Sequence, residues 1–209
     1  MKIKTASFEV SAPDLKACPP SVLPEFALIG RSNVGKSSLI NMLVERRDLA
    51  KVSITPGKTK LINFFKINGT WTLVDLPGYG YAKLAKDKRC DFNDSVANYI
   101  EKRDNLRGVF VLIDSTLPPQ KIDLEFLRWL GDTGRPFALI LTKIDRQSAT
   151  ATRACMALFE EALRDIFGEI PTRIVCSSKT KDGRRELLAL IEQAMSANKT
   201  PGPGSAFPS

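Results

Sequence analysis

Short apolar runs alternate with amphipathic stretches along most of this 209-residue chain. Residues 26–30 form a continuous apolar run, which is typical of a strand buried on both faces of a parallel sheet. Similar runs predict five more strands, over residues 61–67, 71–75, 109–114, 137–141 and 173–176. Helical patterns lie between most of these runs, over residues 36–47, 87–103, 122–130, 149–167 and 184–197.

Two of the apolar runs are joined by Asn68-Gly69, a dipeptide that favours a tight β-hairpin. The other runs alternate with helices, which is the pattern of parallel strands with crossover connections. We therefore expect an α/β fold, namely a doubly wound, mostly parallel six-stranded sheet with helices on both faces and one antiparallel strand pair. In such a sheet the ligand binds at the carboxyl ends of the strands.

The predicted elements all lie within residues 25–197, which are enough to bury the core of one domain. Residues 1–24 carry four prolines and are expected to form an extended lead-in, packed on or beside this domain. Residues 198–209 are rich in proline and glycine and have no apolar face, so they are expected to be a disordered tail.

A glycine-bounded loop directly follows the first apolar run. Its sequence, Gly-Arg-Ser-Asn-Val-Gly-Lys-Ser, matches the G-x-x-x-x-G-K-[ST] pattern between a strand and a helix. Gly30 and Gly35 let backbone amides wrap closely around a phosphate. Lys36 can pair with the β- and γ-phosphates, and the Ser37 hydroxyl can ligate Mg²⁺. The loop therefore predicts a nucleoside triphosphate site formed by Gly30, Arg31, Ser32, Asn33, Val34, Gly35, Lys36, Ser37 and Ser38.

The end of a second strand offers another anchor for Mg²⁺. Asp75 can hold the metal, and the amide of Gly78 can approach the γ-phosphate without steric cost. Alone, a D-x-x-G pattern reads equally well as a plain turn after a strand. Because it follows a phosphate loop here, we add four residues to the predicted site: Asp75, Leu76, Pro77 and Gly78.

Residues 142–145 follow a further apolar strand and are candidates for base recognition. The Asp145 carboxylate can accept hydrogen bonds from N1–H and the 2-amino group of guanine, a pair of donors that adenine lacks. Taken alone, this segment reads as a solvated loop, but its place in the chain favours guanine binding. Small residues after the last strand could offer amides to the guanine carbonyl. The predicted base-binding residues are Thr142, Lys143, Ile144, Asp145, Cys176, Ser177 and Ser178.

Composition excludes several classes of site. The chain has no histidine, which rules out histidine-based triads, metal ligands and general bases. Its four cysteines include no C-x-x-C pair, so neither a disulfide framework nor a zinc site is indicated. Glu9 interrupts what would have to be the apolar core of a signal peptide, and no apolar run approaches a membrane span. We expect a cytoplasmic monomer without an integral membrane segment.

Positive charge is in excess and unevenly spread. The net charge of +8 indicates an acidic partner, first nucleic acid and second an anionic membrane surface. Residues 46–66 hold six basic residues against one acidic, and residues 173–185 hold five against one. A third group consists of Lys83, Lys86, Lys88 and Arg89. The first and third groups lie where segments should respond to a γ-phosphate, which suggests a nucleotide-gated surface for RNA; the alternative is that these side chains keep loops soluble.

Four segments resemble, in the right order, the nucleotide-binding elements of a translation-factor-class GTPase. They are residues 30–37 (G1), 75–78 (G3), 142–145 (G4) and 177–178 (G5). Three stretches, 30–41, 55–59 and 75–81, are similar to the EngB (YihA/YsxC) family, within the TrmE-Era-EngA-YihA-septin GTPases. The resemblance covers the chain up to about residue 197. It implies a P-loop GTPase that binds GTP or GDP with Mg²⁺, acts in assembly of the large ribosomal subunit and, by older description, in division septum formation.

By this resemblance Thr59 is the switch I threonine, which ligates Mg²⁺ and senses the γ-phosphate, and Gly57 and Lys58 belong to the same nucleotide-binding segment. The residues themselves agree only in part, because threonines before strands are common. The expected metal ligands are Ser37, Thr59 and Asp75. The expected catalytic residues are Lys36, Thr59, Gly78 and Asn33.

Two residues depart from common GTPase patterns, and a third, Asn33, matches a group of relatives. Tyr79 stands where Ras-like GTPases place a water-orienting glutamine, so slow intrinsic hydrolysis is expected. Thr142 replaces the commoner asparagine; its hydroxyl can brace the phosphate loop, but the lost amide predicts modest nucleotide affinity. The asparagine at position 33 of the loop is similar to that of potassium-stimulated relatives of the TrmE and Era type. One hypothesis is that its side chain helps hold K⁺. The alternative is that it satisfies the loop backbone.

The leading prediction is a slow, Mg²⁺-dependent GTPase that docks on ribosomal RNA or large-subunit ribosomal proteins when GTP-bound. The alternative is a septum- or membrane-associated interaction protein that uses its GTP state to choose partners. The lack of a clear amphipathic anchor helix or lipidation signal counts against that alternative. A kinase that uses ATP is excluded if Asp145 reads guanine.

Overall fold

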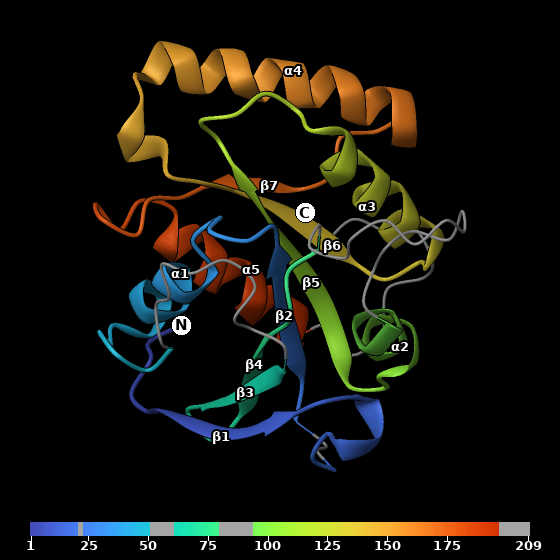
Figure 1. Cartoon of the computed structure of the whole chain (residues 1–209). Coiled ribbons are helices and arrows are strands. Elements are labelled where there is room, and N and C mark those ends of the chain that lie inside the picture. The colour runs from blue at the N-terminus through green and yellow to red at the C-terminus, as the bar shows by residue number, and fades with distance from the viewer. Residues whose placement is uncertain (21–22, 51–60, 80–93, 197–209) are drawn as a thin grey trace.

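A computed structural model of the chain describes residues 1–20, 23–50, 61–79 and 94–196 (Figure 1). The described strands are β1 (Ala6–Ala12), β2 (Glu25–Gly30), β3 (Ile62–Ile67), β4 (Trp71–Asp75), β5 (Leu106–Asp114), β6 (Phe137–Thr142) and β7 (Arg173–Val175). They form one sheet in the order β1-β3-β4-β2-β5-β6-β7. The five strands from β4 to β7 in this order are parallel, and β3 runs antiparallel to β4, as the hairpin signal predicts.

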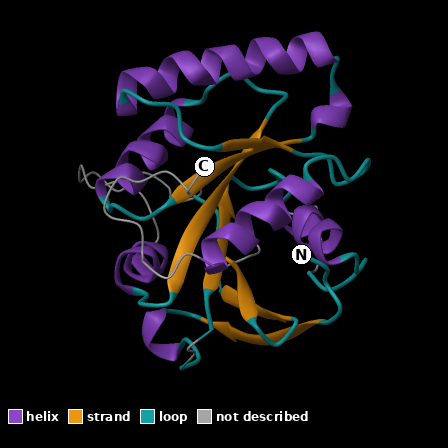
Figure 2. Ribbon diagram, turned by 180° about the vertical axis from the view of Figure 1, so that it is seen from behind, coloured by secondary structure: helices purple, strands orange, loops and turns teal. Residues whose placement is uncertain are grey.

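Helices cover both faces of the sheet (Figures 1 and 2). The described α-helices are α1 (Lys36–Val44), α2 (Asp94–Lys102), α3 (Lys121–Asp132), α4 (Ala149–Phe167) and α5 (Arg184–Ser196), with short 3₁₀ turns η1 (Leu15–Ala17) and η2 (Ile144–Arg146). One core cluster unites α1 and α5 with the sheet, and the other unites α2, α3 and α4 with the opposite face. The doubly wound α/β fold expected from the sequence is therefore confirmed.

The structure adds a seventh strand to the six expected. β1 lies within the segment taken as a lead-in and pairs antiparallel with β3, which makes a second antiparallel pair. Its sequence pattern is weak, since only Ala6 and Ala12 are buried and Phe8 is half exposed. Asn68 of the hairpin holds this segment, because its side chain accepts hydrogen bonds from the amides of Lys4 and Thr5. Long-range pairing rather than local pattern makes this a strand.

Element boundaries follow local signals. α4 has the predicted bounds, and the Ser148 hydroxyl caps it by accepting a hydrogen bond from the amide of Ala151. α1 ends three residues before its predicted end, because Glu45 takes a left-handed conformation with φ 55°. The predicted start of the second helix, residues 87–93, lies outside the described residues, as do residues 197–209.

β2 is the centre of the fold and is buried along its whole length. It pairs with β4 on one side and β5 on the other, both parallel, so that the carboxyl ends of these strands face the same edge of the sheet. β6 ends at that edge too, where Thr142 pairs with Asp114 of β5. The predicted site segments therefore leave the sheet at one edge. None of the described helices is long and apolar enough to cross a membrane.

Candidate functional site

The phosphate loop connects the end of β2 to the start of α1 and has no room for larger residues at its base. A Cβ added to Gly30 would lie 2.6 Å from the carbonyl oxygen of Leu112 in β5 and 2.9 Å from Cγ1 of Val34. Gly35 has space around it, but its φ of 107° is a left-handed conformation that L side chains rarely adopt. Asn33 is also left-handed, with φ 61°, which asparagine tolerates better than most residues. The backbone of the loop therefore depends on residue types at three positions.

The segment after β4 lies directly against this loop. The amide of Leu76 donates to the carbonyl of Leu28 at 3.0 Å, which extends the pairing with β2 beyond the strand. Two residues later, a Cβ on Gly78 would lie only 2.7 Å from the carbonyl oxygen of Gly30. Gly78 is therefore required for the close approach of this segment to the phosphate loop.

Lys36 and Asp75 face each other across this contact. The Lys36 ammonium lies 4.0 Å from Oδ1 of Asp75, and both side chains are largely buried. Within the described part of the chain, Oδ1 of Asp75 is buried without a hydrogen-bond partner. Burial raises the pKa of Asp75 to about 6, against the opposing effect of the nearby Lys36 charge.

This arrangement fits a divalent cation. A buried carboxylate oxygen that lacks a hydrogen bond is stabilised by a cation, and oxygen ligands are those that Mg²⁺ prefers. Ser37, in the first turn of α1 and next to Lys36, offers a hydroxyl. Asp75 and Ser37 are thus chemically suited to the metal role predicted for them. The third predicted ligand, Thr59, lies outside the described residues, together with Gly57 and Lys58.

Thr142 joins the base-recognition segment to the phosphate loop. Its buried hydroxyl donates to the carbonyl of Val34 at 2.7 Å and also lies 3.1 Å from the carbonyl oxygen of Ile113. The hydroxyl is therefore in contact with the loop that it was expected to brace. No asparagine is needed for this contact.

The base-recognition segment is held by two side-chain contacts. Lys143 has a left-handed backbone, φ 63°, and its ammonium donates to Oδ2 of Asp114 at 2.6 Å. The hydroxyl of Ser177 donates to Oδ1 of Asp145 at 2.6 Å, which lowers the pKa of that carboxyl. The carboxylate of Asp145 is therefore kept ionised and oriented by the segment that follows β7.

The segment after β7 is itself fixed by hydrogen bonds. The Ser177 hydroxyl accepts from the amides of Lys179 and Thr180 at 3.2 and 3.1 Å, and the amide of Cys176 donates to the carbonyl of Leu141 at 2.7 Å. The Cys176 thiol is buried, which raises its pKa to about 12. Cys176 is thus suited to a structural role rather than to nucleophilic chemistry.

The side chain of Tyr79 packs against α3. Its hydroxyl donates to Oδ1 of Asp123 in α3 at 2.9 Å, and its ring stacks on Phe126 with 4.3 Å between ring centroids. Arg31 of the phosphate loop donates to the same oxygen of Asp123 at 3.0 Å. Burial, reinforced by the Asp123 charge, raises the pKa of the Tyr79 phenol well above its ordinary value. The phenol is therefore a hydrogen-bond donor held by α3.

Two acidic residues at this edge were missed by the sequence analysis. Asp114 ends the apolar run of β5, just as Asp75 ends that of β4, and this position was a usable signal. Asp123 occupies the buried stripe of α3 together with Phe126, Leu127 and Leu130. A charged residue at an apolar position of a helix was the signal there, although it did not reveal the partners.

The structure brings together the described parts of the predicted site. The phosphate loop touches the Gly78 segment through Gly30 and touches Thr142 through Val34. Asp145 reaches the segment after β7 through Ser177. The predicted residues outside the described part of the chain are Gly57, Lys58 and Thr59, and the basic residues Lys83, Lys86, Lys88 and Arg89 lie outside it too.

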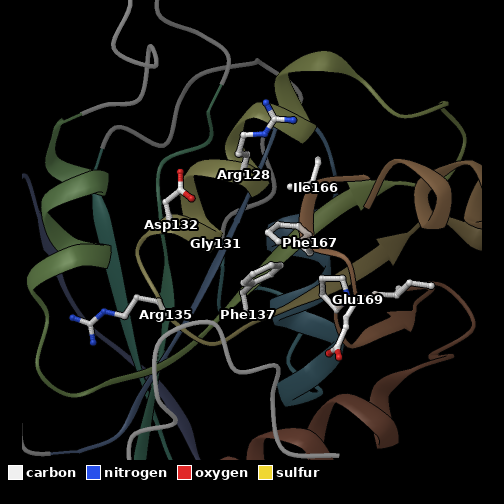
Figure 3. Close-up of a pocket in the computed structure, with 10 residues that line it drawn as sticks. Arg128, Gly131, Asp132, Arg135, Phe137, Ile166, Phe167 and Glu169 are labelled. Carbon is white, nitrogen blue, oxygen red and sulfur yellow. The ribbon is translucent and has the colours of Figure 1, made fainter. Parts of the chain in front are cut away.

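A separate pocket of about 350 Å³ lies between the carboxyl-terminal ends of α3 and α4 (Figure 3). Phe137 and Phe167 form part of its apolar wall, and Arg128 and Glu169 are among its charged lining residues. Gly131 allows this packing, because a Cβ there would lie 2.5 Å from the ring of Phe167. The pocket lining contains none of the residues predicted to bind a nucleotide.

Known proteins match this chain in sequence and in fold. Residues 25–143 match the family described as "50S ribosome-binding GTPase". A protein from Bacteroides fragilis named "Probable GTP-binding protein EngB" is 49% identical over 192 residues, which cover 92% of this chain and 96% of that protein. A protein of the same name from Porphyromonas gingivalis is 48% identical, with the same coverage of 92% and 96%.

A solved structure also resembles this one. It is described as the crystal structure of a probable GTP-binding protein engB, and it superposes with a TM-score of 0.63 at 23% sequence identity. The match covers 82% of this chain and 98% of that chain. At this level of identity the likeness shows a common fold.

Proposed function

Since this chain belongs to the EngB family of GTP-binding proteins, we propose that it is a slow, Mg²⁺-dependent GTPase that acts as a nucleotide-gated switch in assembly of the large ribosomal subunit. The observation that carries the proposal is that, at one sheet edge, the phosphate loop touches the Gly78 segment through Gly30 and touches Thr142 through Val34. Those contacts support a single site for the residues that we propose to bind the phosphates and the base.

Each part of the site has a distinct task in this proposal. Lys36 and the loop amides bind the phosphates, and the amide of Gly78 contacts the γ-phosphate. Asp145, oriented by Ser177, accepts hydrogen bonds from the guanine base. Ser37, Asp75 and Thr59 would hold Mg²⁺, which would supply positive charge to offset the charge that develops during phosphoryl transfer.

Slow hydrolysis follows from the position of Tyr79. The phenol donates to Asp123 and is stacked on Phe126, so it is turned toward α3. The residue after Gly78 therefore does not supply the amide that orients the attacking water in Ras-like enzymes. We expect hydrolysis to need a further contribution from a partner or an ion.

The ion that we propose for this role is K⁺, held with the help of Asn33. Asn33 is exposed in the phosphate loop and has a left-handed backbone, with φ 61°. Turnover of GTP in matched K⁺ and Na⁺ buffers tests the idea, and a faster rate in K⁺ that disappears in Asn33→Ala is expected. Equal rates in the two buffers would mean that Asn33 serves only the loop backbone.

The ribosomal partner is supported by charge and by the family description. The net charge of +8 favours a polyanionic partner, and the matching family is described as ribosome-binding. In the group at residues 173–185, Arg173 pairs with Glu160, while Lys181 and Arg184 both pair with Glu45. Among the described residues of that group, Lys179 and Arg185 form no ion pair and are exposed, so they are the side chains best placed to meet phosphates.

Sedimentation with purified large ribosomal subunits tests this proposal. In the presence of Mg²⁺ and a non-hydrolysable GTP analogue, the full chain should pellet with subunits, and with GDP it should stay largely in the supernatant. Lys36→Ala is the matched control, because without that charge the two nucleotides should give the same result. Pelleting with anionic vesicles in either nucleotide, and not with subunits, would contradict the ribosomal role and favour the membrane- or septum-associated alternative.

A further inference from the structure

Asp123 connects two segments of the nucleotide site that are far apart in the sequence. Its Oδ1 accepts from Nε of Arg31, in the phosphate loop, and from the hydroxyl of Tyr79, the residue after Gly78. Asp123 itself is 1% exposed and belongs to the buried stripe of α3. A single carboxylate oxygen thus joins the phosphate loop, the Gly78 segment and α3.

The carboxylate is only half satisfied. Both donors use Oδ1, while Oδ2 is buried and has no hydrogen-bond partner among the described residues. A buried oxygen without a partner costs free energy, and a purely structural cluster would be expected to avoid that cost. Burial also raises the pKa of Asp123, against the opposing charge of Arg31. One buried oxygen of the cluster is therefore left without a hydrogen bond among the described residues.

A matched cluster at the opposite end of β2 shows what a fully satisfied version looks like. Glu25 accepts from the hydroxyl of Tyr99 at 2.5 Å and from Arg103 through both of its carboxylate oxygens, at 2.9 and 2.7 Å. Arg103 is held further by the carbonyl of Pro19 at 2.8 Å. Each cluster thus consists of a tyrosine, a buried carboxylate and an arginine, but the Glu25 cluster leaves neither carboxylate oxygen unused.

We propose that Asp123 is a positioning residue that, through Tyr79 and Arg31, holds the Gly78 amide in register with the phosphate loop and so favours GTP over GDP. The Gly78 segment touches the loop where a Cβ on Gly78 would lie 2.7 Å from the Gly30 carbonyl. Tyr79 fixes one side of this contact and Arg31 the other, because they directly follow Gly78 and Gly30 in the chain.

The two nucleotides should respond differently when this cluster is broken. Only GTP has the γ-phosphate that meets the Gly78 amide, whereas GDP relies on Lys36 and the loop amides. Loosening Tyr79 therefore weakens GTP selectively. The inference rests on the proposed function, because it concerns the response of the same site to the γ-phosphate.

The test measures dissociation constants of the full chain for GDP and for a non-hydrolysable GTP analogue, with Mg²⁺, by titration calorimetry. Tyr79→Phe removes only the hydroxyl and keeps the ring on Phe126. Tyr99→Phe is the matched control, because it removes the equivalent hydroxyl at the Glu25 cluster. Arg31→Gln is the second variant, since the Arg31 side chain is 25% exposed and its replacement is less demanding on folding.

We expect Tyr79→Phe to weaken binding of the GTP analogue about 5- to 10-fold, which is at the lower end of the range for coupling between linked sites. The dissociation constant for GDP should change less than about twofold. Arg31→Gln should shift the ratio in the same direction. Tyr99→Phe should lower the melting temperature without changing the ratio. If Tyr79→Phe weakens both nucleotides equally or neither, or if Tyr99→Phe changes the ratio as much, the positioning role of Asp123 is wrong.

Titrations of the unaltered chain with the same two nucleotides and with ATP separate this inference from the proposed function. If the unaltered chain binds neither guanine nucleotide, or binds ATP equally well, the proposed function itself fails. If the unaltered chain prefers guanine nucleotides and the ratio is insensitive to Tyr79→Phe, only the inference about Asp123 fails.

Discussion

Near each end of β2, a buried carboxylate accepts hydrogen bonds from a tyrosine and an arginine, and the two clusters differ in how many carboxylate oxygens are used. At Glu25, where the strand begins, the carboxylate uses both oxygens, and Arg103 also lies over the ring of Phe64 at 5.8 Å. Beyond Gly30, where the strand ends, Asp123 uses one oxygen for two donors. Both tyrosine hydroxyls are buried, and burial raises the pKa of each phenol.

We assign an anchoring role to the Glu25 cluster and a positioning role at the nucleotide site to the Asp123 cluster. The Glu25 cluster joins α2 to the start of β2 and to the segment before it. The Tyr99 hydroxyl and the Arg103 guanidinium both have hydrogen-bond acceptors there. The Asp123 cluster joins segments that we propose respond to the γ-phosphate, and among the described residues its Oδ2 has no hydrogen-bond partner. A fully satisfied cluster resists rearrangement, whereas the unpaired Oδ2 of Asp123 can accept a further donor when the cluster adjusts to a ligand.

The largest expected effect is on stability at the Glu25 end. Glu25→Ala leaves the largely buried Arg103 and the Tyr99 hydroxyl without their acceptor. Removal of one partner from a buried ion pair costs about 3–5 kcal/mol, so the free energy of unfolding should fall by that amount in urea titrations. The more conservative Glu25→Gln, which keeps an acceptor, should cost less. A loss below about 1 kcal/mol for Glu25→Ala would contradict the anchoring role.

The next effect is on binding at the Gly30 end. Gly78→Ala places a Cβ against the Gly30 carbonyl, so the Gly78 segment must move away from the loop. Overpacking of this kind costs about 1–3 kcal/mol, and we expect most of it in the affinity for a GTP analogue. Gly69→Ala is the control, since Gly69 has a left-handed φ of 67° in the hairpin and open space around it. Gly69→Ala should lower stability and leave the affinity for the GTP analogue unchanged. A loss of affinity in Gly69→Ala, with none in Gly78→Ala, would contradict the role given to the Gly78 segment.

A smaller effect is expected where Thr142 braces the loop. Thr142→Val keeps the shape of the side chain and removes the hydroxyl that donates to the Val34 carbonyl. A lost hydrogen bond to a buried group costs about 1–2 kcal/mol, and both GDP and GTP should weaken because the whole loop is affected. Thr142→Ser keeps the hydroxyl and should bind almost as well as the unaltered chain. Equal loss in both variants would assign the effect to packing instead.

The smallest expected effect is spectroscopic. The ring centroids of Trp129 and Phe126 are 5.5 Å apart, and Phe126 stacks on Tyr79. Trp71 instead belongs to the core cluster on the other face of the sheet. Exchange of GDP for a GTP analogue should therefore change the emission of Trp129 slightly. The change should vanish in Trp129→Phe and persist in Trp71→Phe. A change that depends on Trp71 would mean that the response spreads through the sheet rather than along α3.

Much of the fold follows from local sequence signals. β4 and α4 have the predicted bounds because an apolar run ends at Asp75 and a serine caps the helix. β1 could not be predicted in this way, since its sequence is mostly exposed and it pairs with residues 50 or more positions away in the chain. Local pattern identifies elements that bury their own faces and misses those defined by their neighbours.

The site divides in the same manner. The phosphate loop was predictable because all of its chemistry lies in eight consecutive residues. The Asp123 cluster was not, because Arg31, Tyr79 and Asp123 come from three segments that meet only in the folded chain. The replacement of a glutamine by Tyr79 was visible in the sequence, but the direction of its side chain was not.

We propose that this edge of the sheet binds a guanine nucleotide through Asp145, and the base preference of Asp145→Asn tests this role. Asparagine replaces one acceptor with a donor, which suits the 2-oxo group of xanthine and opposes the 2-amino group of guanine. Affinities for GTP and XTP, measured side by side, should reverse in order between the unaltered chain and the variant. Unchanged GTP affinity in Asp145→Asn would contradict guanine recognition by Asp145.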